Sequence, residues 1–334
     1  MIDIYFETDY GKLHEKVEGG TCEVFEYRSS AGTIRHMFIK RKVPIQIGNI
    51  AYYDLITPYE YGGPLICDCR VGEKKKLVKG FEKAFGEYCQ ENQIVSEFVR
   101  FHPLVENAMD FQSCYQVVHS RNTVGTNLRA YQDPFMDEFS KSARRSIRRA
   151  LRAGVDFRVI EGPNDLGDFK EVYYDTMNRN KAADFYYFSD DYFNACLRFF
   201  RDNIVLVEAV YQGKTIASGL YFVYNDLIHA HLSGTLANYL SLSPAYVLRY
   251  AITLWGKERD YTLIHHGGGT TKRRNDSLYR FKKRFGKNTG FEFYVGKRIW
   301  NQRIYRHLCE QKKVREDMGF FPAYRTVRRK EAEG

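Results

Sequence analysis

Residues 227–269 read LIHAHLSGTLANYLSLSPAYVLRYAITLWGKERDYTLIHHGGG. Residues 227–233 form a strand-like run, which is followed by a loop ending at Pro244. Residues 245–258 then show a helical pattern, and residues 261–265 form a second strand-like run. The stretch therefore predicts one strand–loop–helix–strand unit of an α/β fold.

A similar order of elements occurs earlier in the chain. A predicted strand at 50–56 leads into a loop rich in Pro and Gly at 58–64, then a helix at 73–90 and a strand at 96–101. Two copies of one α/β unit fit the length of the chain. We expect the boundary between them near residues 130–140, where Asp133-Pro134 precedes a basic helix.

The remaining elements favour a mixed α/β fold rather than a doubly wound sheet, because hairpins are interspersed among crossovers. Further strands are predicted at 21–27, 33–40, 46–56, 204–210, 215–224 and 290–295. Further helices are predicted at 134–152, 166–177, 190–200 and 299–311.

The composition is that of a globular protein, with 334 residues, 44% hydrophobic and 28% charged. The first ten residues carry Asp3, Glu7 and Asp9 where a signal peptide would carry basic and then apolar residues, so we expect a cytoplasmic protein. Seven cysteines are too few for a disulfide framework and lack zinc-ligand spacing, which predicts buried free thiols.

Charge is distributed unevenly along the chain. Residues 1–135 hold 16 Lys and Arg against 18 Asp and Glu, whereas residues 136–334 hold 35 against 23. The second part therefore carries a net charge of +12 and the first −2. This asymmetry indicates either a polyanionic partner for the second part or a solvated basic surface.

Two basic runs account for much of this charge. Residues 141–158 contain seven basic side chains and one acid, Asp156, on a helix whose Ile147 and Leu151 face inward. Residues 272–287 contain eight basic side chains and one acid, interleaved with Tyr279, Phe281 and Phe285. Such runs suit phosphate and nucleic-acid contact, but they also suit solvated amphipathic helices with aromatic residues in the core.

Several strong motifs are absent: a P-loop, HExxH, a GxSxG elbow and GxGxxG. His229 and His231 share a strand face without a third ligand, so we predict sheet histidines and no metal site. The triplet Gly267–Gly269 allows a close backbone approach, which indicates either a tight turn or a phosphate cradle.

Several segments together resemble the FemABX-like branch of the GNAT acyltransferase superfamily. Residues 54–64 (DLITPYEYGGP) resemble its D-x-x-x-P-Y-x-Y-G-G-P signature, and residues 142–155 (SARRSIRRALRAGV) resemble its second marker. The remaining markers are HLSGT at 231–235, LSP at 242–244, HGGG at 266–269 and DSLYRFKK at 276–283. The resemblance runs over about residues 35–305.

The resemblance implies two tandem GNAT-like domains in an armless, FemX-like arrangement. We expect an acceptor-binding domain at 1–135 and a basic, donor-binding domain at 136–316. A C-terminal tail at 317–334 can return to the first domain. The implied activity is transfer of an aminoacyl group from aminoacyl-tRNA to an amine of a peptidoglycan-precursor-like or natural-product acceptor. No bound cofactor is implied.

The resemblance also suggests site residues. Asp54 orients or deprotonates the amine, or caps the loop before Pro58. The tRNA acceptor end is expected at Phe281 and Lys282, with Lys282 polarising the ester carbonyl. Residues expected to bind a phosphorylated or muropeptide acceptor are Lys40, Tyr59, Tyr61 and Arg179. Residues expected to bind the donor tRNA, besides Phe281, are Lys283, Arg145, Arg149, Gly267 and Gly268.

Two other functions remain open from the sequence. The first is an acyl-CoA-dependent GNAT N-acyltransferase, although the chain lacks a clear Q/R-x-x-G-x-G/A pyrophosphate loop. The second is a non-catalytic RNA-binding protein, for which the basic second part is the argument.

Overall fold

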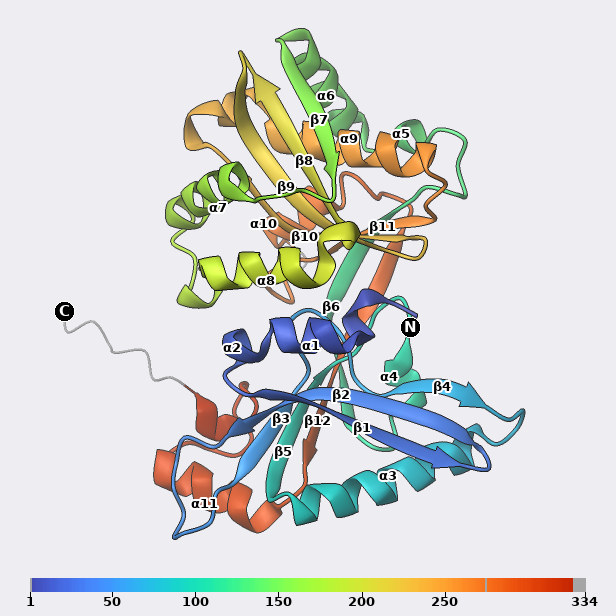
Figure 1. The fold of residues 1–334 in the computed structure, drawn as a ribbon, viewed down its shortest axis with the longest axis vertical. Coiled ribbons are helices and arrows are strands. Elements are labelled where there is room, and N and C mark those ends of the chain that lie inside the picture. Colours follow the sequence, from blue (N-terminus) through green and yellow to red (C-terminus); the bar gives the residue numbers. More distant parts are fainter. Residues whose placement is uncertain (1, 274, 327–334) are drawn as a thin grey trace, which may run out of the picture. The chain divides into compact units, whose positions relative to one another are not determined.

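The computed structural model describes residues 2–273 and 275–326 (Figure 1). The chain forms two compact units, each assembled from separate stretches. Of the described residues, unit 1 comprises 2–4, 121–273 and 275–292, and unit 2 comprises 5–120 and 293–326. Strands β6 (Gln116–Asn127) and β12 (Gly290–Ile299) each carry the chain from one unit into the other.

These units differ from the predicted ranges 1–135, 136–316 and 317–334. The first changeover lies inside β6, where no Pro or Gly cluster marks it, and the chain returns to unit 2 at Phe293. Residues 317–326 of the predicted tail belong to unit 2, and residues 327–334 lie outside the described residues.

Unit 1 contains a mixed sheet with the strand order β6-β11-β10-β9-β8-β7. Its other strands are β7 (Val155–Glu161), β8 (Ile204–Tyr211), β9 (Lys214–Tyr224), β10 (Leu227–Thr235) and β11 (Leu263–Gly268). All neighbours are antiparallel except β10 and β11, which are parallel. A parallel pair requires a crossover, and the helix between residues 244 and 258 supplies it.

The helices of unit 1 cover both faces of this sheet. They are α5 (Pro134–Asp137), α6 (Lys141–Arg152), α7 (Gly167–Arg179), α8 (Asp190–Phe200), α9 (Pro244–Glu258) and α10 (Ser277–Lys282). Helices α6 and α9 share one hydrophobic core with β7 to β11. The helix predicted at 134–152 is two helices, because the Ser140 hydroxyl accepts from the Ala143 amide and starts α6 afresh.

Helix α7 packs on the opposite face of the sheet, against β9 and β10 (Figure 1). Gly234 of β10 makes this close contact feasible, because a Cβ there would lie 2.4 Å from the Val172 carbonyl oxygen of α7. The Thr176 hydroxyl of α7 accepts from the Thr235 amide at 2.7 Å, which ties the end of β10 to the helix.

Unit 2 contains the strands β1 (Thr21–Ser29), β2 (Gly32–Lys42), β3 (Tyr53–Ile56) and β5 (Ile94–Arg100), in the order β1-β2-β3-β5-β12, with β4 (Leu65–Cys69) on β2. Its helices are α1 (Thr8–Leu13), α2 (Glu15–Glu18), α3 (Lys74–Glu91), α4 (Asn107–Asp110) and α11 (Gln302–Lys312). The strand predicted at 46–56 is present only as its last four residues, β3.

The two predicted strand–helix–strand repeats are both present. Strands β3 and β5 are parallel and flank α3, as β10 and β11 are parallel and flank α9. The fold is therefore the expected mixed α/β fold. All seven cysteines are free, and four of them are buried as predicted, but Cys22 and Cys69 are only partly buried and Cys67 is exposed. Within the described residues, no helix has the length and apolar character that crossing a membrane requires.

Candidate functional site

The parallel strands β10 and β11 separate partway along their length. They are in register over three residue pairs, ending at His229–His265. Beyond that point β10 bulges at His231 and β11 bulges at His266, and no further pairing joins these strands in the described residues. Beyond this point β10 loses β11 as a pairing partner, at the carboxyl end of a parallel pair where α/β sheets bind ligands. At the last residue of β10, the Thr235 amide and carbonyl bond to Thr176 and Arg179 of α7.

The loop that follows β11 is held by one carboxylate. Asp276 Oδ2 accepts from the amides of Thr270 and Thr271 at 3.1 and 2.9 Å and from both of their hydroxyls. Its Oδ1 accepts from the Tyr279 amide at 2.8 Å and caps α10. Burial raises the pKa of Asp276, but these hydrogen bonds outweigh it and hold the pKa well below its usual range.

The glycines of this loop form a tight turn. Gly267 has a φ of 72°, which favours glycine, and a Cβ on Gly269 would lie 2.3 Å from Asp276 Oδ1. The Gly268 carbonyl accepts from Lys282 Nζ at 2.9 Å. Since the following amides already donate to Asp276, this geometry favours the turn over a phosphate cradle at Gly267 and Gly268.

Helix α10 brings three of the predicted donor-site residues together. Lys282 is partly buried beside Gly268, as its hydrogen bond shows. Phe281 packs edge-on against Tyr246 and Phe285 at 5.3 and 5.0 Å, so it also belongs to a hydrophobic cluster. Lys283 donates to the Gly286 carbonyl at 3.0 Å, and burial lowers its pKa.

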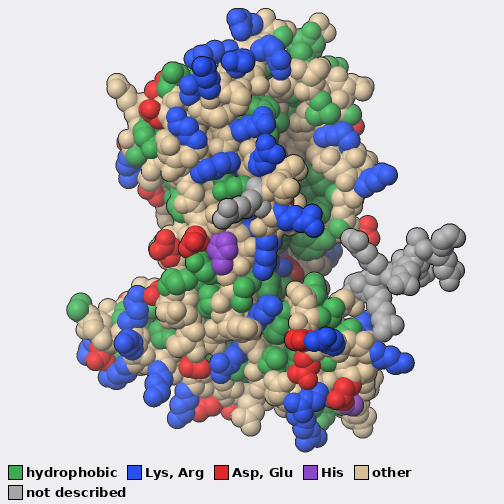
Figure 2. Space-filling view, turned by 180° about the vertical axis from the view of Figure 1, so that it is seen from behind, with side chains coloured by type: hydrophobic (Ala, Val, Ile, Leu, Met, Phe, Trp, Pro, Cys, Tyr) green, Lys and Arg blue, Asp and Glu red, His purple; other side chains and the backbone are tan. Residues whose placement is uncertain are grey.

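Helix α6 presents the predicted arginines to solvent. Arg145 and Arg149 are exposed, whereas Ala143, Ile147 and Ala150 are buried. Arg149 Nη2 donates to the Ser243 hydroxyl at 3.4 Å, which places it at the start of α9. Figure 2 shows Lys and Arg side chains gathered at the end of unit 1 where α6 lies.

The contacts of Asp54, which the sequence analysis predicts to be catalytic, favour a structural role in unit 2. It is fully buried, and Arg41 Nε donates to its Oδ1 at 2.8 Å. Its Oδ2 accepts from Arg325 and, at 3.2 Å, from the Tyr324 hydroxyl. The carboxylate therefore already accepts hydrogen bonds from two guanidinium groups and a phenol. This arrangement favours a structural role, in which Asp54 anchors residues 323–325 to β3, over removal of a proton from an amine.

The predicted acceptor residues of unit 2 differ in their exposure. Lys40 donates to Asn92 Oδ1 at 3.0 Å and lies over the Tyr53 ring. Tyr61 is buried, and its ring meets Tyr5, His102 and Phe293 edge-on. Tyr59 is only partly buried and keeps a face toward solvent. Of the two tyrosines, Tyr59 therefore suits ligand contact better than Tyr61.

Arg179, the fourth predicted acceptor residue, lies in unit 1 at the end of α7. Its guanidinium donates to the Thr235 carbonyl at 2.7 Å and to Asp175 at 3.1 Å. These bonds hold it at the end of β10, with 27% of the side chain still exposed.

The sequence interpretation missed a buried polar group beneath α9. Arg249 of α9 is 6% exposed and donates to the Tyr221 hydroxyl of β9 at 3.1 Å. His266 of β11 is fully buried, with Nε2 bonded to the Thr126 hydroxyl at 2.8 Å. The one available signal was a charged residue on the otherwise apolar face of the helix predicted at 245–258.

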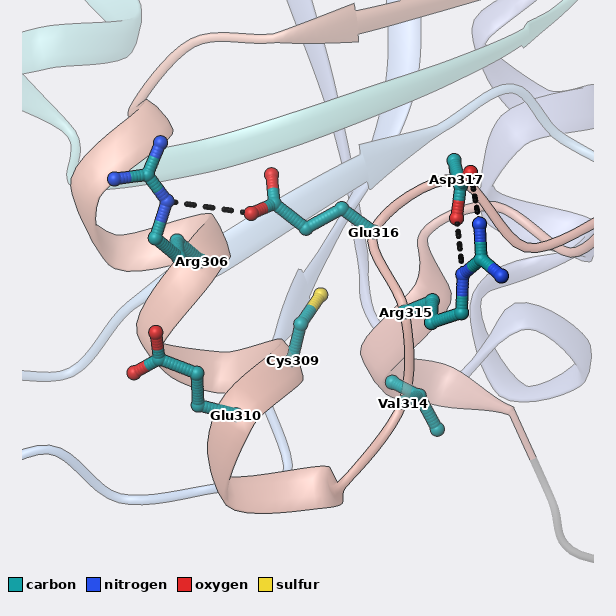
Figure 3. A pocket seen from close by; sticks show the side chains of 7 residues that line it. All are labelled: Arg306, Cys309, Glu310, Val314, Arg315, Glu316 and Asp317. Atoms are coloured by element: carbon teal, nitrogen blue, oxygen red, sulfur yellow. Dashed lines mark hydrogen bonds and ion pairs between the residues drawn. The ribbon is translucent and has the colours of Figure 1, made fainter.

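No group of three or more His, Cys, Asp or Glu side chains in the described part of the chain is arranged to hold a metal ion. Unit 2 has a surface pocket of about 360 Å³ at the end of α11 (Figure 3). The ion pairs Arg306–Glu316 and Arg315–Asp317 line it. Burial raises the pKa of its Cys309 to about 11, so this thiol is not a reactive nucleophile.

Comparison with known proteins supports the family. Residues 137–283, all within unit 1, match the model of the acetyltransferase (GNAT) domain. The chain is 22% identical over 235 residues to a UDP-N-acetylmuramoylpentapeptide-lysine N(6)-alanyltransferase of Weissella viridescens, covering 64% of this chain and 68% of that protein.

Two solved structures share the fold. A crystal structure of FemX superposes with a TM-score of 0.68 at 13% identity, covering 91% of this chain and 94% of that one. The C-terminal domain of a putative lysylphosphatidylglycerol synthetase from Agrobacterium fabrum gives a TM-score of 0.57 at 13% identity, covering 93% and 92%. The GNAT domain match, the alanyltransferase relative and this shared fold together support a transferase of the FemABX-like branch of the GNAT acyltransferase superfamily.

Proposed function

We propose that this protein transfers an aminoacyl group from aminoacyl-tRNA to an amine of a peptidoglycan-precursor-like or natural-product acceptor. The observation that carries the proposal is the separation of β10 from β11, with Lys282 bonded to Gly268 at the end of β11. The Weissella viridescens relative is named as an alanyltransferase acting on the lysine of UDP-N-acetylmuramoylpentapeptide. We place the activity in the cytoplasm, where charged tRNA is available.

The chemistry suits direct attack of the amine on the ester carbonyl. Such a step needs the two reactants aligned, a proton removed from the amine and the developing oxyanion stabilised. The ammonium of Lys282 can polarise the carbonyl. Burial raises the pKa of Cys114 and of Cys196 to about 12, so these thiols stay protonated and unsuited to a covalent acyl intermediate.

The proposed donor contacts lie in unit 1. The exposed guanidinium groups of Arg145 and Arg149 suit tRNA phosphates, and Phe281 and Lys283 flank Lys282 on α10. Within unit 1, we propose that Arg179, which keeps exposed area at the end of β10, contacts the acceptor. Tyr59 and Lys40 of unit 2 remain separate candidates for acceptor contact.

An acyl-CoA-dependent reaction is the second candidate, because the matched family model is an acetyltransferase domain. A pyrophosphate bound at the loop after β11 would need free backbone amides. Those of Thr270, Thr271 and Tyr279 donate instead to Asp276, whose negative charge would repel the pyrophosphate. These three amides are therefore not free to bind the pyrophosphate of CoA, and the chain lacks a clear Q/R-x-x-G-x-G/A loop.

The two candidates are separated by measuring the thermal stability of the protein with each ligand. We expect charged or deacylated tRNA, or a UDP-linked muropeptide, to raise the melting temperature, and CoA and acetyl-CoA to leave it unchanged. A rise with CoA alone would contradict the proposal and support an acyl-CoA enzyme.

A further inference from the structure

Arg249 is a buried cation without an anion. Only 6% of the residue is exposed, and in the described part of the chain its guanidinium has one hydrogen-bond partner, the Tyr221 hydroxyl at 3.1 Å. The guanidinium also lies 5.6 Å from the centre of the Tyr221 ring. Neither contact supplies a negative charge, and no carboxylate of the described residues forms an ion pair with Arg249.

The surroundings of Arg249 are also poor in anions. His266, fully buried, bonds Thr126 through Nε2, and its Nδ1 has no hydrogen-bond partner among the described residues. Burial lowers the pKa of His266 well below its usual range, and the nearby charges of Arg249 and Lys282 lower it further. His266 is therefore neutral, and two cations share its neighbourhood.

This group lies at the point where β10 and β11 separate. Tyr221 of β9 pairs with Ala230, the last residue of β10 before its bulge, and His266 is the bulged residue of β11. Tyr221 belongs to the core under α9, the helix that carries Arg249. The guanidinium of Arg249 therefore lies near β10 and β11, just beyond their last residue pair, His229–His265.

Burying a charge is costly unless the charge is paired, and fully buried arginines in folded proteins are almost always paired. If only stability mattered, replacing this unpaired arginine with an apolar side chain of similar size would raise the free energy of unfolding. The missing anion is therefore expected to come from a ligand.

We propose that Arg249 binds a single oxyanion group that enters between β10 and β11: a carboxylate or phosphate of a substrate, or the oxyanion that forms during acyl transfer. Tyr221 holds the guanidinium in place. Because the Thr126 hydroxyl donates to the Phe285 carbonyl, it accepts from His266 Nε2, so neutral His266 has no proton on Nδ1 and adds no donor to this group.

The third of these sources rests on the proposed function. In that reaction the lone pair of the amine nitrogen forms a bond to the ester carbonyl carbon, and the carbonyl π electrons move to oxygen. When this intermediate collapses, the bond to the ribose oxygen breaks and that oxygen takes the proton released by the nitrogen. Arg249 and Lys282 would stabilise the negative oxygen while it exists.

The first test needs no acyl donor and compares wild type, Arg249→Met and a matched control, Arg198→Met, an exposed arginine of α8. Melting temperatures are measured in sodium acetate and in sodium phosphate at constant ionic strength. We expect at least one anion to stabilise wild type and Arg198→Met in a saturable way, and the shift to be lost in Arg249→Met. Equal shifts in all three proteins, or none in wild type, would overturn the proposal.

A second comparison guards against a folding defect. Arg249→Met leaves the buried Tyr221 hydroxyl without its donor, so the double variant Arg249→Met/Tyr221→Phe removes both partners. We expect its melting temperature without anions to equal or exceed that of wild type. A marked fall would show that the arginine is structural and would contradict the proposal.

The kinetic test distinguishes the source of the anion. If the oxyanion forms during transfer, Arg249→Met lowers kcat by about 100-fold with the KM of both substrates little changed. If a substrate carries the anion, the KM of that substrate rises. Unchanged kcat and KM would overturn the proposal. Absence of any aminoacyl transfer in wild type would contradict the proposed function alone, since the anion-binding result stands without it.

Discussion

At the scale of single residues, one carboxylate organises the end of the candidate site. Asp276 receives hydrogen bonds from two loop amides, two hydroxyls and the amide of Tyr279 in the first turn of α10. Gly268, whose carbonyl meets Lys282, directly precedes that loop. Asp276 therefore affects the position of Lys282 indirectly, through the loop that it holds, and the two side chains need not touch.

Asp276→Asn keeps a capping oxygen but removes the charge, and we expect a loss of about 1–2 kcal/mol at pH 7. Because the folded pKa of Asp276 is depressed, its contribution is complete above the unfolded pKa of about 4 and declines as pH falls further. Urea unfolding of both proteins from pH 7 to 3 measures this. A stability difference that grows as pH falls would contradict it.

A buried polar pair lies in the core of unit 2. His36 Nε2 and Glu97 Oε1 are 2.5 Å apart, both residues are at most 1% exposed, and Trp300 Nε1 donates to Glu97 at 3.1 Å. His36→Leu leaves the carboxylate without its main partner, so we expect a loss of about 3–5 kcal/mol in denaturant unfolding. The exposed pair Lys83–Glu87 is the control, where Lys83→Leu should cost less than about 1 kcal/mol.

At the scale of elements, the sequence predicts those with a strong period. Helix α3 buries Leu77, Val78, Phe81, Phe85 and Cys89, as its spacing indicates. Strands β4, β6 and β7 are not among the predicted strands. In β6, exposed and partly buried residues interrupt the alternation, whereas β7 does alternate but overlaps the end of the basic run at 141–158. The same is true of the candidate site. The basic face of α6 can be predicted from the sequence, whereas the separation of β10 from β11 depends on two bulges that do not alter the hydrophobic pattern.

The exposed face of α6 can be tested against salt. We expect Arg145→Ala/Arg149→Ala to weaken tRNA binding and to reduce the slope of log affinity against log salt by about two units. Lys75→Ala/Lys79→Ala, which removes two exposed charges from α3, is the matched control and should keep the wild-type slope. An unchanged slope in the α6 variant would show that these arginines form a solvated surface and do not contact tRNA phosphates.

The contact between α7 and β10 is tested at Gly234. Gly234→Ala would place a Cβ 2.4 Å from the Val172 carbonyl oxygen, so the helix must move away from the strand. We expect a loss of about 1–3 kcal/mol, measured by chemical unfolding. Ser233→Ala, one residue earlier on β10, should cost less than about 1 kcal/mol. Equal effects of the two variants would argue against the close approach.

At the scale of the whole molecule, the two units are interleaved in sequence. Residues 2–4 belong to unit 1, where Asp3 bonds His229 of β10 at 3.0 Å, although residues 5–120 form unit 2. Residues 323–325 belong to unit 2 and reach Asp54. The sequence analysis allows for a return of the tail to the first domain, but the return of residues 2–4 to unit 1 leaves no mark in local composition because it depends on tertiary contacts.

The most direct test of the central claim is transfer of a radiolabelled amino acid from charged tRNA to a UDP-linked muropeptide. We expect wild type to form an alkali-stable amide product and Lys282→Ala to form it at least about 100-fold more slowly. Lys287→Ala, an exposed lysine shortly after α10, is the control. Product formed only from an acyl-CoA donor, with none from any charged tRNA, would contradict the account.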